Sequence, residues 1–222
     1  MSISDESIRM SRVFFTKADY LPDVVLDLDD FAENPGNSKE CLELLVKQKE
    51  LFPNLKVTLF AIPFYEDKDN SPFFKTVIEK YDWIQLAIHG WTHITPTECK
   101  EWTLEEAIAK ISKAYAMGCF VKGFKAPGWQ ISRDTYVALD SLKFWVADHT
   151  SSEYTEPGVL NALRRPPTLK AYTVDHPWIV HGHTWDLNNP DPAYNNGIRQ
   201  IIEVHGVPWD IKSKFHFISE IV

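Results

Sequence analysis

Two histidines, His89 and His93, stand four positions apart in the segment His-Gly-Trp-Thr-His. One helical turn or a tight loop can point both imidazoles at the same ion. Two neutral imidazoles and a carboxylate form a known hydrolytic metal site, in which further positions stay open to water and substrate. Two unrelated histidines can show the same spacing, so the pair needs a carboxylate partner before it predicts a metal site.

Asp29 and Asp30 follow a mostly apolar run and supply that carboxylate. Neighbouring residues of a strand point to opposite faces, so the two aspartates share a site only if the chain bends there. The end of a strand allows such a bend. One carboxylate can then bind a metal while the other acts as a base. The structural alternative is a helix N-cap or a solvated turn.

The elements that must position these residues alternate between strands and helices, which predicts parallel β/α units in one α/β domain. Thr103 and Glu106 form a capping box and Ser132 is a second N-cap. Strands are expected at residues 24–30, 56–62, 83–88, 123–126, 144–147, 178–180 and 215–218, and helices at 38–52, 73–81, 103–117, 132–142 and 196–205.

Polar residues repeatedly follow the apolar part of an expected strand. In a β/α barrel such positions gather at the carboxyl-terminal rim, where these folds place their chemistry. The pattern therefore predicts one shared site for Asp29, Asp30, His89, Lys125, Asp148 and His181.

The composition narrows the class of protein. The chain has 222 residues, enough for one domain, and a formal net charge of −8, which argues against a nucleic-acid-binding surface. Three widely spaced cysteines with no Cys-x-x-Cys predict reduced thiols and no disulfide framework. No signal peptide or membrane-spanning run is evident, so we expect a cytoplasmic protein that acts on a small molecule or glycan.

Taken in their order along the chain, these motifs resemble those of the polysaccharide deacetylases, the family 4 carbohydrate esterases. The resemblance covers about residues 24 to 183 and implies a distorted, incomplete (β/α) barrel as a single catalytic domain over residues 1–222. Five segments carry it: Leu28-Asp29-Asp30 resembles the core of Thr-Phe-Asp-Asp-Gly, residues 56–60 resemble Lys-Ala-Thr-Phe-Phe, residues 89–93 match His-(Ser/Thr)-x-x-His, residues 125–129 resemble Arg-x-Pro, and Ile179-Val180-His181 resembles Leu-x-His.

The resemblance implies removal of an acetyl group from an N-acetylated sugar by water activated on a divalent cation, with zinc the expected metal. It also implies a role for each matching residue: Asp29 as general base; Asp30, His89 and His93 as metal ligands; His181 as general acid, oriented by Asp148; Lys125 in place of an arginine that positions the base; and Pro127 and Trp129 as the substrate wall. His183 lies on the same strand face as His181, and is both the alternative acid and a candidate for substrate binding.

Four positions depart from the family pattern: Asp27 replaces a threonine, Phe31 a glycine, Gly90 a serine or threonine, and Lys125 the arginine. Lysine offers one compact charge instead of a planar fork, so the positioning of Asp29 is open. Two other functions remain: an amidohydrolase or esterase acting on a small non-sugar substrate, and a non-catalytic carbohydrate-binding relative.

Overall fold

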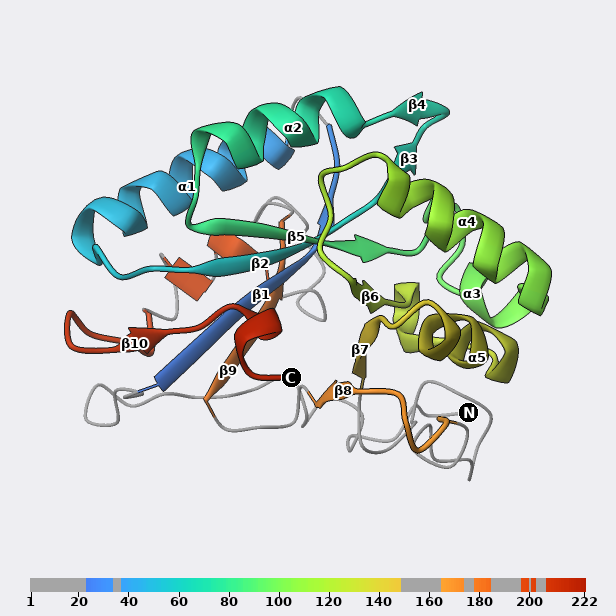
Figure 1. Ribbon diagram of the computed structural model, residues 1–222. Coiled ribbons are helices and arrows are strands. Elements are labelled where there is room, and N and C mark those ends of the chain that lie inside the picture. Colours follow the sequence, from blue (N-terminus) through green and yellow to red (C-terminus); the bar gives the residue numbers. More distant parts are fainter. Residues whose placement is uncertain are drawn as a thin grey trace, which may run out of the picture.

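The computed structural model describes residues 23–33, 37–148, 165–173, 178–184, 197–199, 201–202 and 207–222. Its main element is a curled sheet of eight strands (Figure 1). The strands are Asp23–Phe31 (β1), Val57–Ala61 (β2), Ile84–His89 (β5), Gly123–Lys125 (β6), Trp145–Asp148 (β7), Ala171–Thr173 (β8), Ile179–His183 (β9) and Lys214–Phe215 (β10). They follow the order β10-β1-β2-β5-β6-β7-β8, with β9 also paired to β1, and all these pairings are parallel.

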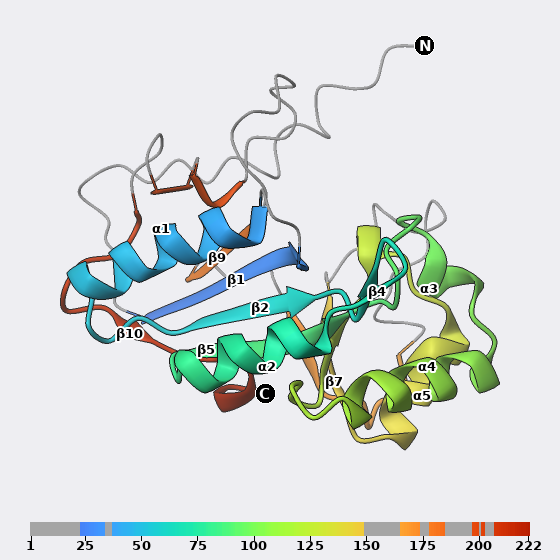
Figure 2. The ribbon, with the colours of Figure 1, turned by 90° about the horizontal axis from the view of Figure 1, so that it is seen from above.

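Helices cover the outer face of this sheet. Two of them lie side by side over β1, β2 and β5, and another two pack against each other beside β6 and β7 (Figures 1 and 2). In order they are Asn37–Leu51 (α1), Ser71–Lys80 (α2), the short Glu98–Glu101 (α3), Leu104–Ala116 (α4) and Arg133–Ser141 (α5), with 3-10 turns at Pro127–Trp129 and Ile218–Glu220. A small antiparallel hairpin joins Phe64–Tyr65 (β3) to Lys68–Asp69 (β4).

The alternation of β1 decides which side chains enter the curl. Leu26 and Leu28 belong to the large core cluster shared with the helices, whereas Val25 belongs to a smaller cluster on the inner face. Because side chains alternate along a strand, Asp27 and Asp29 point inward with Val25. The inner cluster consists of Val25, Phe60, Ala87, Trp145, Ala147, Tyr172, Ile179 and Ile218, and it fills the curl below the polar residues.

The barrel is incomplete. Among the described strands no pairing joins β8 to β9, so the circle of parallel strands stays open there. The expected fold class, a distorted and incomplete (β/α) barrel in a single domain, is confirmed. None of the helices that the structure describes combines the length and apolar character needed to span a bilayer.

Most expected elements are present within a residue or two of their predicted bounds. Both helix caps are confirmed, because Thr103 and Glu106 form their reciprocal pair and Ser132 accepts from the Thr135 amide. The strand expected at 215–218 is wrong beyond Phe215, where the chain turns into the Ile218–Glu220 3-10 turn. The helix expected at 196–205 lies largely outside the described residues.

Candidate functional site

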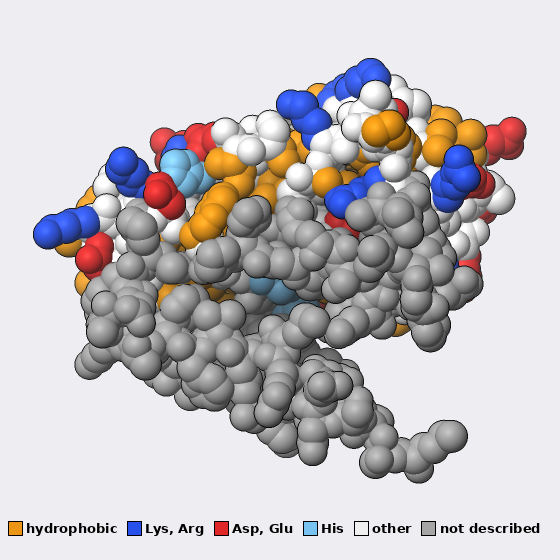
Figure 3. Space-filling view, turned by 90° about the horizontal axis from the view of Figure 1, so that it is seen from below, with side chains coloured by type: hydrophobic (Ala, Val, Ile, Leu, Met, Phe, Trp, Pro, Cys, Tyr) orange, Lys and Arg blue, Asp and Glu red, His pale blue; other side chains and the backbone are white. Residues whose placement is uncertain are grey.

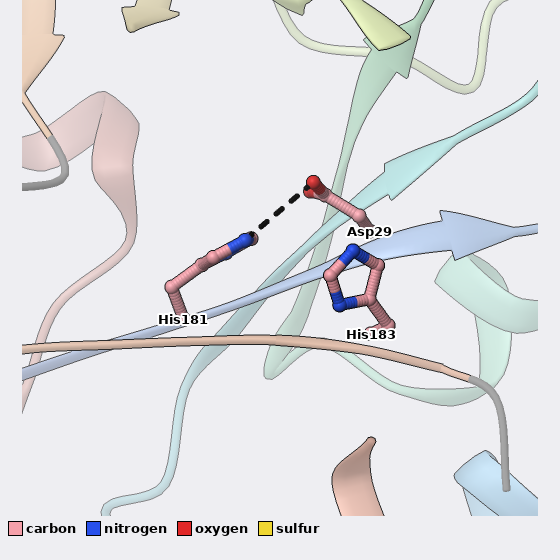
Figure 4. Close-up of side chains that lie close together, drawn as sticks. All are labelled: Asp29, His181 and His183. Carbon is pink, nitrogen blue, oxygen red and sulfur yellow. Dashed lines mark ion pairs between the residues drawn. The ribbon is translucent and has the colours of Figure 1, made fainter. Parts of the chain in front are cut away.

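Inward-facing polar side chains from four strands meet at the carboxyl end of the sheet. Asp29 and His183 occupy paired positions on β1 and β9, and Asp27 and His181 do the same two residues earlier. Figure 4 shows Asp29, His181 and His183 turned toward one another. In the space-filling view, histidine side chains are visible near the middle of the molecule (Figure 3).

A bend at the end of β1 brings Asp30 into the same site. The register between β1 and β2 shifts between Leu28 and Phe31, and Asp30 has a φ of 65°. Left-handed backbone is uncommon outside glycine, and aspartate is among the residues that tolerate it. The shift turns the Asp30 side chain to join the inward face. The bend that two neighbouring aspartates need in order to share a site is therefore present.

Asp30 lies between the two histidines of the His-x-x-x-His segment. Its Oδ1 is 3.3 Å from the Nε2 of His89 and 3.1 Å from the Nε2 of His93. The Nδ1 of His89 lies 3.0 Å from the carbonyl oxygen of Lys125, which can only accept, so this nitrogen carries the proton. In the neutral ring, the Nε2 of His89 therefore carries the lone pair, and this is the tautomer that a metal ligand needs.

The loop between the histidines is held by Glu98, which begins α3. Its carboxylate accepts hydrogen bonds from the amides of Trp91, Thr92 and His93 at 2.7, 3.2 and 3.2 Å. A Cβ added to Gly90 would lie 2.1 Å from Oε1 of Glu98, and Gly90 has a φ of 64°. Only a residue without a side chain fits at this position, because the carboxylate of Glu98 occupies the space.

Asp30, His89 and His93 fit a divalent cation. Their ligand atoms all lie within 4.8 Å of one another. Burial alone would raise the pKa of Asp30, but its hydrogen bonds to both histidines outweigh burial and hold that pKa well below its usual value. Burial alone would lower the pKa of His93, yet its hydrogen bond with Asp30 raises it. The donor set, one carboxylate and two imidazoles, is one that zinc accepts.

A buried lysine joins the carboxylates behind the cation triad. Lys125 is fully buried, with Nζ 2.7 Å from Oδ1 of Asp29 and 3.1 Å from Oδ1 of Asp27. Its Nζ also lies 4.1 Å from the centre of the Trp129 ring. Burial by itself would raise the pKa of Asp27, but the charges of Lys125 and His181 outweigh it and lower that pKa to about 2. Two departures from the family pattern, Asp27 and Lys125, are thus direct partners.

His181 lies beside a carboxylate that was not expected to orient it. The Nδ1 of His181 lies 2.6 Å from Oδ1 of Asp27, and its Nε2 lies 3.7 Å from Oδ2 of Asp29. The sequence interpretation assigned the orienting carboxylate to Asp148, whose Oδ2 instead accepts a hydrogen bond from the hydroxyl of Tyr136. The pairing of β9 with β1 brings His181 beside Asp27, whereas the side chain of Asp148 at the end of β7 points outward, toward α5.

The predicted substrate-contacting residues differ in exposure. Trp129 is half-buried and its ring meets that of His181 edge-on, with 5.4 Å between centroids. Pro127 is buried and lies against Gly90, so it supports the loop between His89 and His93. His183 has its ring centroid 5.4 Å from that of His181. Trp129 and His183 therefore border the polar cluster from two sides.

Comparisons with known proteins place this geometry in a known architecture. No model of a protein family matches the sequence, and no curated protein gives a significant match. Three solved structures are similar along most of their length. The first is a family 4 acetyl xylan esterase from Clostridium thermocellum in complex with a cobalt ion, with a TM-score of 0.52, 15% identity and coverage of 89% of each chain. The second is the Xyl-CE4 domain of a multidomain xylanase from the hindgut metagenome of Trinervitermes trinervoides, with a TM-score of 0.54, 17% identity and coverage of 90% of this chain and 89% of that chain. The third is the chitin deacetylase of Colletotrichum lindemuthianum, with a TM-score of 0.53, 16% identity and coverage of 91% of this chain and 88% of that chain.

These similarities cover 89%, 90% and 91% of this chain, while sequence identity stays at 15–17%. They match the expectation drawn from the ordered motifs. The chain therefore has the fold of the family 4 carbohydrate esterases.

Proposed function

We propose that this chain is a cation-dependent deacetylase that removes an acetyl group from an N-acetylated sugar or glycan. The observation that carries the proposal is the placement of Asp29 and His181, a carboxylate and an imidazole, face to face beside the Asp30, His89 and His93 triad. The proposal treats residues 1–222 as one catalytic domain, with the motifs at about residues 24–183.

Asp30, His89 and His93 would hold the divalent cation, and zinc suits this donor set. A cation bound there supplies Lewis acidity, which lowers the pKa of a water molecule and polarises the acyl carbonyl. His89 is prepared for this role because its Nδ1–H is fixed on the Lys125 carbonyl. Glu98 holds the loop that presents His93.

Asp29 is the general base in this proposal. Its Oδ1 is held by Lys125 at 2.7 Å, and its Oδ2 is the oxygen turned toward His181. Oδ2 is thus placed to accept the proton of the attacking water. Lys125 takes the positioning role of the family's arginine with a single charge instead of a planar fork.

His181 is the general acid, acting through Nε2. Asp27 accepts from Nδ1 and fixes the orientation of the ring. The protonated imidazole then gives the proton on Nε2 to the leaving nitrogen, a task that histidine side chains perform in general acid catalysis. Acetate and a free amine are the products. Trp129 offers a half-exposed ring for a sugar face, and His183 flanks the same space.

The test measures acetate released by the purified, metal-loaded chain from N-acetylglucosamine oligomers, O-acetylated xylan oligomers and small acetamides. We expect release from the N-acetylated sugar, its loss on chelation and its return with zinc or cobalt. His93→Ala should abolish it, whereas the control His216→Ala, which removes a histidine at the opposite end of β1, should not. A chain that binds one cation but releases acetate from none of these substrates contradicts the proposal.

A further inference from the structure

A second group of ligand atoms converges beside the first. Asp29, His181 and His183 each offer one donor atom, and these atoms all lie within 4.8 Å of one another. The strand register produces this arrangement, because His183 pairs with Asp29 and His181 lies two residues earlier on the same face of β9. Figure 4 shows the three side chains directed into the same space.

The separation between two of these atoms suits a shared cation better than a direct contact. The Nε2 of His181 and Oδ2 of Asp29 are 3.7 Å apart, which is too long for a hydrogen bond. Two ligands of a tetrahedral cation, each at about 2.0–2.2 Å from it, are roughly 3.4 Å apart. A cation therefore fits between these two atoms after a shift of a few tenths of an ångström.

Lys125 leaves this position available. It approaches Asp29 at Oδ1, whereas the oxygen facing His181 is Oδ2. The other nitrogen of His181 is held by Asp27, so the ring presents Nε2 to the space it shares with Asp29. Both ligands are thus oriented by partners on their far sides, as metal ligands in proteins usually are.

We propose that Asp29, His181 and His183 form a second divalent-cation site, and that its occupation inhibits the enzyme. The part concerning inhibition rests on the proposed function, because the same cation takes the base and the acid out of use. The charges make this site the weaker one. Asp27, Asp29 and Asp30 carry three negative charges and Lys125 one positive charge, so with neutral imidazoles one divalent cation neutralises the cluster and a second adds uncompensated charge.

The binding test is a cobalt titration of the chelator-treated protein, followed by the visible absorption of Co²⁺ and by metal analysis after gel filtration. We expect two ions per chain, the second with an apparent dissociation constant about tenfold or more above that of the first. His183→Gln should remove the second ion and keep the first. The control His216→Gln should keep both. One ion per chain at every cobalt concentration overturns the proposal, as does a second ion that His183→Gln leaves unchanged.

A second measurement does not depend on any variant folding. Crystals of the wild-type protein soaked in cobalt should show two anomalous peaks, one of them between His181 and Asp29. A single peak in the Asp30 triad at saturating cobalt refutes the second site.

Activity separates this proposal from the proposed function. Acetate release should rise and then fall as zinc increases, and for His183→Gln the ratio of the rates at high and low zinc should stay near one. Two bound ions without acetate release refute the deacetylase and leave the site standing. Acetate release with one bound ion and no loss at high zinc refutes the site alone.

Discussion

Replacing Asp27 with asparagine tests the network behind the acid most directly. The amide has almost the same shape, and its oxygen can still accept from Lys125 and His181, so the fold is preserved. The change removes a buried charge that lies 2.6 Å from the Nδ1 of His181. A hydrogen bond to a charged group contributes about 1.5–3 kcal/mol, and each 1.36 kcal/mol is tenfold in rate. We therefore expect kcat on an N-acetylated sugar to fall about 10- to 150-fold, with little change in KM.

The choice of substrate distinguishes loss of the acid from general damage. An amine must be protonated as it leaves, whereas the phenolate of 4-nitrophenyl acetate leaves without a proton. Asp27→Asn should therefore lose much less rate on the aryl ester than on the amide. An equal loss on both substrates would show that the variant had disturbed the whole site instead of the acid.

Asp148→Asn is the matched comparison, because it removes a buried carboxylate of the same kind from β7, on the face that packs against α5. Its hydrogen-bond partner is Tyr136, which is fully buried, so the expected cost is about 1–3 kcal/mol in the free energy of unfolding. The ratio of amide to ester rates should stay near that of the wild type. If Asp148→Asn changes that ratio and Asp27→Asn does not, the assignment of Asp27 is refuted.

Three further results follow from the geometry. Gly90→Ala forces a Cβ to 2.1 Å from Oε1 of Glu98, and should weaken zinc binding about 10- to 100-fold in competition with a chromogenic chelator. An unchanged zinc affinity would contradict the role of Glu98 in holding the loop between His89 and His93. Because Asp30 raises the pKa of His93, zinc must displace a proton, so zinc affinity should increase with pH and level off above that pKa. Calorimetry in buffers of different ionisation enthalpy measures the number of protons released on zinc binding. Zinc binding without proton release would contradict this prediction. Lys125→Met leaves two buried carboxylates without their cation and should lower the free energy of unfolding by about 3–5 kcal/mol in urea; a change below about 1 kcal/mol would show that the ion pairs contribute little.

The parts of the site that the sequence predicts are those set by local rules. Alternation places Asp27 and Asp29 on one face, and the four-residue spacing of His89 and His93 allows both to reach one point. The bend at Asp30 follows from the need of two adjacent carboxylates to share that point. These are relations between near neighbours in the chain, and they need no knowledge of which strands are adjacent.

The parts that could not be predicted depend on strand order. Asp148 and Asp27 both lie near a strand end, but Asp148 follows Ala147 of the inner cluster, so its carboxylate is directed outward to Tyr136. The pairing of β9 with β1 brings the inward carboxylate of Asp27 to His181. The available signal was the position of Asp27, two residues before Asp29 and therefore on the same face. The family pattern has a threonine at that position, so the resemblance assigns Asp27 no role.

Glu98 was missed for a different reason. It lies in a helix of one turn, five residues after His93, where composition gives no special signal. Its role is visible only once the three amides of the loop are seen to converge on its carboxylate. The sequence signal that pointed to Glu98 was Gly90, which stands where the family pattern has a serine or threonine. A position without a side chain leaves room for the side chain of another residue.

The pairing of β9 with β1 also sets the order in which the site is completed during synthesis. Asp27 and His181 are separated by 154 positions in the chain. At about 5–20 residues per second, the imidazole is synthesised roughly 8–30 s after the carboxylate that orients it. Residues 30, 89 and 93 are all present well before then. A growing polypeptide thus carries a complete set of cation ligands for many seconds before it has the means to protonate a leaving group, so metal acquisition can precede catalytic competence.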